Sequence, residues 1–145
     1  MREPLRDART WLNQAERDLE AARLLTERFP ALACFHAQQS AEKALKAALY
    51  AAGERPVLGH ALAELGDRVL RHDPSYAELH AEVAKLDRYY IGTRYPNGLP
   101  EGAEPDTAFD EGDARSAIAT ASRALTAARR SVEDRANAGG SASDP

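Results

Sequence analysis

One segment of the 145-residue chain concentrates polar side chains of the kind that bind an anion. It spans residues 35–46, FHAQQSAEKALK, and places Gln39, Lys43 and Lys46 at spacings of four and three. On a helix of 3.6 residues per turn these three side chains share one side, where the ammonium groups meet a phosphate as point charges. The alternative is that they form the solvated flank of a helix. Both interpretations fit the spacing.

The same segment contains two polar residues where apolar ones are expected. In a helical projection Gln38 and Glu42 lie among the apolar side chains of Phe35, Leu45 and Leu49. A buried carboxylate is costly unless it is paired and hydrogen-bonded. We therefore expect Gln38 and Glu42 to form a structural polar core. The partner expected for Glu42 is at least one of His60, Tyr90 and Arg94.

A second segment whose residue types could bind a ligand is Tyr90-x-x-x-Arg94-Tyr95-Pro96. An arginine between two tyrosines can clamp a phosphate while a ring stacks on a base. These residues are therefore candidates for ligand binding. In the alternative interpretation the tyrosines cover the core and Arg94 pairs with Glu42.

His60 is the third candidate, at the head of a predicted helix, where it caps the helix, bonds a neighbour or belongs to a site. No metal site is expected, because the histidines show neither an HExxH pattern nor a close Cys/His pattern. Cys34 and His36 are two residues apart on a helix and point apart, which disfavours a nucleophile pair. No glycine-rich phosphate loop is present, and no cofactor is expected. The histidines are His36, His60, His72 and His80.

Apolar periodicity predicts the helices that position these residues: 8–29, 32–52, 60–71, 74–90 and 107–134. Pro30 closes the first, Gly53 follows the second as its C′ residue, and Asp73-Pro74 starts the fourth. Thr107 with Asp110 resembles a weak capping box for the last helix. Three prolines and two glycines predict an irregular loop at 96–106.

These elements predict an all-α fold. We expect an up-and-down antiparallel helical bundle of four main helices plus one short helix, built as a single domain over residues 1–135. The Gly/Ser/Ala-rich residues 136–145 are expected to form a disordered tail.

The composition of the chain indicates which kinds of partner its overall charge would attract. The net charge is −4, which attracts neither nucleic acid nor membrane as a whole. Residues 96–114, however, hold six acidic residues and no Lys or Arg. The net charge of the rest of the chain is therefore +2, so a local basic surface is still possible. The single cysteine excludes a disulfide within the chain, and we expect it to be a small buried hydrophobe. The charged start and the lack of a long apolar run predict a soluble cytoplasmic protein with no membrane segment.

Together these residues resemble the HEPN domain family. The resemblance rests on Trp11, Ala15 and Asp18-Leu19, on residues 35–46, and on Gly53, His60, Leu62, Tyr90 and Arg94-Tyr95-Pro96. It covers residues 9–131. It implies an α-helical bundle that often forms a homodimer, a nucleotide or RNA ligand, and often a minimal nucleotidyltransferase encoded beside it in a toxin–antitoxin-like pair.

Many members of that family are metal-independent ribonucleases with an Arg-x(4–6)-His motif near the start of a late helix. Here no histidine follows His80, and only Arg55 and His60 have that spacing, in a loop and at a helix head. Three hypotheses follow: a nucleotide- or RNA-binding module, a ribonuclease toxin using Arg55 and His60, and a structural partner that binds no ligand. Whether the chain is an enzyme stays open at this point.

Overall fold

The computed structural model describes residues 2–142, and within that range the chain is built of helices, turns and loops without a strand. The predicted all-α fold class is therefore confirmed. The α-helices are α1 (Arg2–Leu25), α2 (Pro30–Ala51), α3 (Leu62–His72), α4 (Ala77–Ala84), α5 (Pro105–Ala108) and α6 (Glu111–Ala142).

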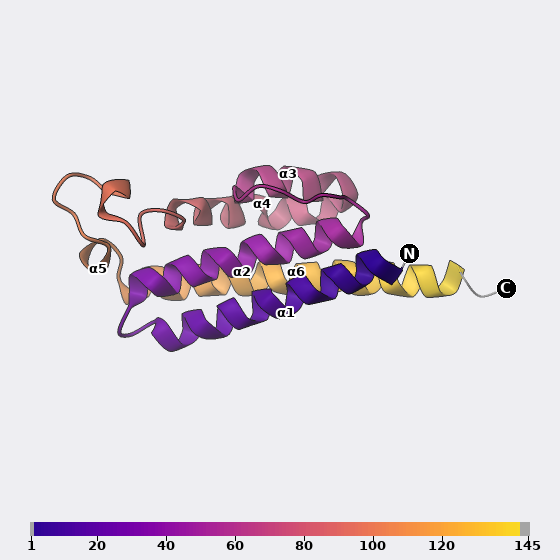
Figure 1. The fold of residues 1–145 in the computed structure, drawn as a ribbon, viewed down its shortest axis with the longest axis horizontal. Coiled ribbons are helices and arrows are strands. Elements are labelled where there is room, and N and C mark those ends of the chain that lie inside the picture. The colour runs from indigo at the N-terminus through magenta and orange to yellow at the C-terminus, as the bar shows by residue number, and fades with distance from the viewer. Residues whose placement is uncertain (1, 143–145) are drawn as a thin grey trace.

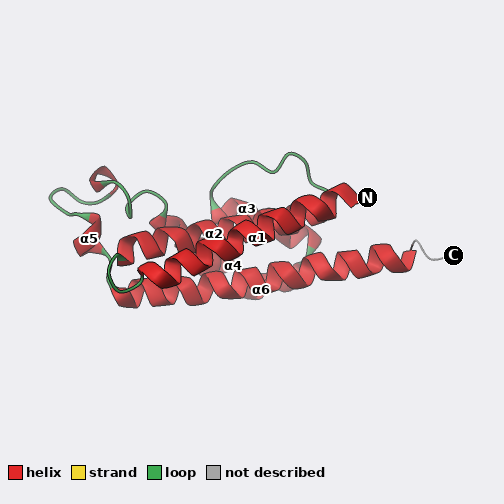
Figure 2. Ribbon diagram, turned by 60° about the horizontal axis from the view of Figure 1, so that its bottom comes forward, coloured by secondary structure: helices red, strands yellow, loops and turns green. Residues whose placement is uncertain are grey.

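The three long helices α1, α2 and α6 lie side by side (Figure 1). α3 packs on α2, on the side away from α1, and α4 packs on α3 and on α6. α1 and α2 form an antiparallel hairpin, and the beginning of α1 and the end of α6 lie at the same end of the bundle (Figures 1 and 2). α2 therefore contacts more of the fold than any other described element, which explains its many buried residues.

The ends of α2 follow from its sequence. Pro30 occupies the first helical position, where its missing N–H would have no partner anyway. At the other end Gly53 adopts a φ of +90°, and its N–H donates to the Tyr50 carbonyl at 2.9 Å, while Glu54 N–H donates to the Leu49 carbonyl at 3.1 Å. These two bonds form a Schellman motif, which confirms Gly53 as the C′ residue.

Small side chains let α1 approach α2 closely. Ala37, Ala41 and Ala44 are fully buried, as expected for a smooth strip on α2. Ser40, which we placed on the polar side, is also buried, and its hydroxyl donates to the backbone carbonyl of Ala15 in α1 at 2.7 Å. The hydrogen bond satisfies the hydroxyl in the interior, which is why a polar residue is tolerated there.

The predicted fourth helix is divided in the structure. A 3₁₀ turn at Pro74–Tyr76 precedes α4, and a second one, Lys85–Tyr89, follows it. Asp73 caps the first turn as predicted, by accepting from Ser75 N–H. Asp87, in the second turn, accepts hydrogen bonds from the amides of Leu62 (2.6 Å) and Ala63 (3.2 Å). A residue 25 positions away thus caps α3, and His60 does not.

The acidic loop and the last helix differ from expectation at their boundaries. The loop predicted to be irregular contains a 3₁₀ turn, Pro96–Gly98, and the first two residues of α5, because proline is well placed in the first turn of a helix. The capping box of α6 pairs Asp110 with Asp113 rather than with Thr107. We expected residues 136–142 to be disordered, but α6 continues through them. The alanines in this stretch favour the helix. Residues 143–145 of the expected tail lie outside the described residues.

Candidate functional site

Glu42 is the centre of a buried polar network on α2. Its side chain is only 4% exposed and contacts three groups. His60 Nδ1 lies 3.2 Å from Oε2, Lys46 Nζ lies 3.2 Å from Oε2, and Gln38 Nε2 lies 3.5 Å from Oε1. The predicted contact with His60 is therefore present. The carboxylate is compensated inside the fold, as its burial requires.

Lys46 belongs to this network and not to the exposed side of α2. We expected it to face a ligand, but its side chain is 8% exposed and pairs with Glu42. Its Nζ also lies 5.4 Å from the centre of the Trp11 ring, a cation–π contact. Lys46 therefore holds α1 and α2 together, and a ligand on the surface does not reach it.

Arg94 organises a second cluster, at the surface. Its guanidinium lies 4.3 Å from the Phe35 ring, 5.0 Å from the Tyr90 ring and 5.1 Å from the Tyr95 ring. Nε and Nη2 donate to the Tyr90 carbonyl at 2.9 and 2.7 Å, so Arg94 does not pair with Glu42. The Tyr90 ring stacks on His60 at 5.3 Å. We call Phe35, His60, Tyr90, Arg94 and Tyr95 the Arg94 cluster.

The Arg94 cluster is assembled from three parts of the chain. Phe35 comes from α2, His60 from the loop before α3, and the others from the turn that follows the second 3₁₀ segment. In that turn the amides of Arg94 and Tyr95 donate to the Ile91 carbonyl at 3.0 and 3.1 Å. Tyr95 is 51% exposed, and the His60 side chain is 61% exposed. Rings and a guanidinium are thus available to a ligand at one place.

A third group lies on α1 and α2. Asp18 Oδ2 lies 2.5 Å from Lys43 Nζ, and Asp18 Oδ1 lies 3.1 Å from His36 Nδ1. Burial alone would raise the pKa of Asp18, but the hydrogen bonds from His36 and Lys43 outweigh it and lower the pKa below the ordinary value. An ionised carboxylate only accepts, so His36 Nδ1 carries the hydrogen in this contact.

Two other predicted residues have partners within the fold. Lys43 is 24% exposed, so its stem borders solvent while its ammonium group is held by Asp18. Gln39 donates from Nε2 to Gln38 Oε1 at 2.7 Å, which links the flank of α2 to the Glu42 network. Both side chains are therefore partly exposed and also fixed in position.

The two ribonuclease candidates point toward different elements. Arg55 forms ion pairs with Asp7 and Glu3 on α1. His60 contacts Glu42 on α2 and the Tyr90 ring. No contact joins Arg55 to His60 within the described part of the chain. The spacing of these residues along the sequence therefore does not assemble them into one site.

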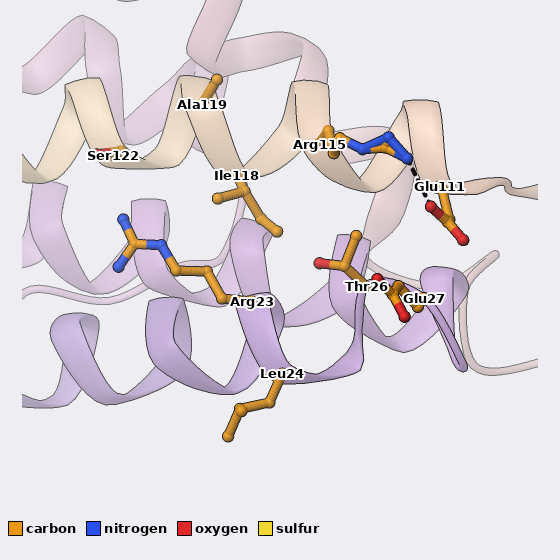
Figure 3. A pocket seen from close by; sticks show the side chains of 9 residues that line it. All are labelled: Arg23, Leu24, Thr26, Glu27, Glu111, Arg115, Ile118, Ala119 and Ser122. Atoms are coloured by element: carbon orange, nitrogen blue, oxygen red, sulfur yellow. Dashed lines mark hydrogen bonds and ion pairs between the residues drawn. The ribbon is translucent and has the colours of Figure 1, made fainter.

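A hollow lies elsewhere, between the end of α1 and the start of α6 (Figure 3). It measures about 620 Å³ and contains none of the predicted site residues. Arg115 on its α6 side is already paired with Glu111, and Leu24 points away from α6. Among residues 2–142 no group of three or more His, Cys, Asp or Glu side chains is arranged to hold a metal ion, and no helix is long and apolar enough to cross a bilayer.

Comparison with known proteins agrees with the all-α fold. The HEPN domain model matches residues 8–131. The chain therefore belongs to the HEPN domain family. The comparison with curated proteins found no match.

Two solved structures are similar to this chain. TT1696 from Thermus thermophilus has a TM-score of 0.72 and 33% identity, over 88% of this chain and 97% of that one. ST0689, an archaeal HEPN homologue, has a TM-score of 0.70 and 36% identity, over 86% and 97% of the two chains. Both likenesses extend over nearly the whole fold.

Sequence reasoning missed several partners that the structure brings together. Asp18 as the anchor of Lys43 and His36, and Phe35 as a ring beneath Arg94, were not expected in these roles. For Asp18 a signal existed, because its spacing places it beside Ala15 and Ala22 on a mostly apolar side of α1. No local pattern connects Phe35 with Arg94.

Proposed function

We propose that this HEPN-family chain binds a nucleotide or RNA at the Arg94 cluster. The observation that carries the proposal is the position of the Arg94 guanidinium, within 5.1 Å of three ring centres at the surface. The guanidinium N–H groups that do not donate to the Tyr90 carbonyl suit phosphate, and the exposed Tyr95 ring suits a base. Lys43 and Gln39 lie on α2, the helix that carries Phe35, and both side chains are partly exposed. They extend the polar surface beside the Arg94 cluster.

The proposal includes two partners, both supported by the family resemblance. One is a second copy of the chain, and the other is a minimal nucleotidyltransferase in a toxin–antitoxin-like pair. Light scattering after gel filtration tests the homodimer. Co-purification with the product of a neighbouring nucleotidyltransferase reading frame tests the other partner. A monomeric mass at micromolar concentration contradicts the homodimer.

The ligand is tested by titrating fluorescently labelled ATP, GTP and a short single-stranded RNA against the purified chain. Arg94→Ala is expected to weaken binding about tenfold or more, because stacking and phosphate contacts are each worth about 1–3 kcal/mol. Arg94→Lys keeps the charge but loses the planar group, so we expect it to weaken binding as well. Arg71→Ala is the matched control, since Arg71 is an exposed arginine in the last turn of α3.

Two results contradict the proposal. One is the absence of binding of all three ligands to the wild-type chain. The other is equal affinity of the wild type and Arg94→Ala. Incubation of the RNA without divalent metal, followed by a search for 2′,3′-cyclic phosphate ends, tests the ribonuclease alternative in the same samples. We expect no cleavage that depends on His60, because His60 and Arg55 face different partners.

A further inference from the structure

A second hollow with aromatic walls lies at the other end of α2 from Phe35. It measures about 440 Å³ and is lined by Asp7, Trp11, Tyr50, Arg55 and Pro56. It shares no residue with the Arg94 cluster. Its size falls within the range of about 300–1,000 Å³ that is usual for small-molecule sites. We call it the Trp11 hollow.

The rings of the Trp11 hollow are held in place from inside the protein. Trp11 and Tyr50 stack with their centres 5.9 Å apart and their planes inclined by 14°. The buried Lys46 ammonium lies 5.4 Å from the Trp11 ring and is itself fixed by Glu42. A ligand ring that stacks here therefore meets a surface that is already ordered, which reduces the entropic cost of binding.

An exposed ion pair supplies the polar side of the hollow. Arg55, whose side chain is 44% exposed, pairs with Asp7, whose side chain is 34% exposed, and also with Glu3, whose side chain is 72% exposed. Such exposed pairs are worth only about 0–1 kcal/mol, so a ligand separates or rearranges this one at little cost. The pair presents guanidinium donors and carboxylate acceptors side by side in the lining of the hollow.

Guanine matches this combination better than the other bases. Its O6 and N7 accept two hydrogen bonds from one arginine, and its N1–H and N2–H₂ groups donate to a carboxylate. Where guanine offers the two acceptors O6 and N7, adenine offers the acceptor N7 and the donor group N6–H₂. Adenine therefore cannot accept two hydrogen bonds from Arg55 at this edge. Unstacked bases are commonly bound in this way, between an aromatic face and polar groups at the base edges.

We propose that the Trp11 hollow is a base-binding subsite that takes the guanine base of a nucleotide or of single-stranded RNA. The inference rests on the ligand class of the proposed function and uses none of the residues of the Arg94 cluster. The base lies against the stacked Trp11–Tyr50 pair. Arg55 donates to O6 and N7, and Asp7 accepts from N1–H and N2–H₂.

The single tryptophan makes the subsite directly observable, because all of the indole fluorescence comes from Trp11. GMP, AMP and inorganic phosphate are titrated against the full chain while tryptophan emission is followed. We expect saturable quenching by GMP, at least about tenfold weaker binding of AMP, and no change with phosphate. Free tryptophan titrated in parallel corrects for absorption by the nucleotides.

Variants separate the subsite from the Arg94 cluster. Asp7→Asn is expected to weaken GMP binding about tenfold while the chain stays folded, because Asp7 is partly exposed. Arg71→Ala, at an exposed arginine of α3 outside both sites, is expected to leave the quenching by GMP unchanged. No saturable change of emission with GMP, or equal affinities for GMP and AMP that Asp7→Asn does not alter, overturns the inference.

The outcomes also distinguish this subsite from the proposed function. If RNA binding depends on Arg94 while Trp11 emission does not respond to GMP, the Trp11 hollow is refuted and the Arg94 site stands. If GMP quenches Trp11 and RNA binding is unchanged in Arg94→Ala but lost in Asp7→Asn, the Trp11 hollow stands and the Arg94 site is refuted.

Discussion

Removing the charge of Glu42 is the most direct test of the buried network. Glu42→Gln keeps the shape of the side chain and removes the carboxylate that lies 3.2 Å from Lys46 Nζ. The Lys46 side chain is only 8% exposed, so its ammonium group then has no compensating charge in the interior. Breaking a buried pair in this way costs about 3–5 kcal/mol. His60 adds little, because its side chain is 61% exposed.

We therefore expect Glu42→Gln to lower the free energy of unfolding by about 3 kcal/mol, at the lower end of that range. In urea, with a slope of about 2 kcal/mol/M, the midpoint falls by about 1.5 M. The melting temperature falls by about 6–12 °C for a chain of this length. Circular dichroism of the helix signal at neutral pH measures both quantities. Glu20→Gln, at an exposed position of α1, is the control and is expected to change little.

A double-mutant cycle shows whether the ion pair is the cause. Lys46→Met removes the other charge, and the double variant Glu42→Gln/Lys46→Met leaves no buried ion behind. Replacing both members of a buried pair is often nearly neutral, so the double variant is expected to be more stable than Glu42→Gln alone. The reasoning is refuted if Glu42→Gln stays within about 0.5 kcal/mol of the wild type, which is the range of ordinary surface changes. Additive losses in the double variant refute it as well.

Three further predictions concern single residues. Asp18→Asn is expected to destabilise the chain at neutral pH, because the pKa of Asp18 is lowered in the fold. That stabilisation is present above the ordinary value of 3.8 and is lost as the pH falls through the lower folded pKa, so the difference in urea midpoint between variant and wild type should shrink below about pH 4. Cys34 is fully buried, and burial raises the pKa of its thiol to about 12. We expect it to react with a thiol reagent such as DTNB only after unfolding in urea, and rapid reaction in the native state would contradict its burial. Asp87→Ala removes the cap of the first amides of α3 and is expected to cost about 1–2 kcal/mol in urea unfolding, whereas an unchanged midpoint would show that water replaces the cap.

The helices and their ends were largely predictable because the relevant forces are local. Gly53 and Asp73-Pro74 mark boundaries that the structure confirms, since each depends on backbone geometry within a few residues. Pro30 was expected to close the first helix at Phe29, but α1 already ends at Leu25 and Pro30 begins α2. The boundaries that differ are those where a short 3₁₀ turn or a capping side chain competes with the helix, as at Asp110.

The candidate site was only partly predictable for a different reason. Helical spacing states which side chains share a face, but it does not state which neighbour covers that face. Lys43 and Lys46 have equivalent spacing in the sequence, yet Lys46 is buried beneath Trp11 while Lys43 is partly exposed beside Asp18. That difference depends on where α1 crosses α2.

The sequence alone determined the all-α class, the family resemblance and the fact that Glu42 needs an internal partner. The fold class and the need of Glu42 for a partner follow from periodicity and from the cost of a buried charge, while the resemblance follows from matching residues along the chain. None of the three depends on distant contacts. Only the tertiary structure decided that this partner includes His60, that Arg94 lies against Phe35, and that Trp11 and Tyr50 border a hollow with Arg55. Each of these contacts joins residues from separate elements, and their meeting depends on how α1, α2 and the loop after each helix pack together.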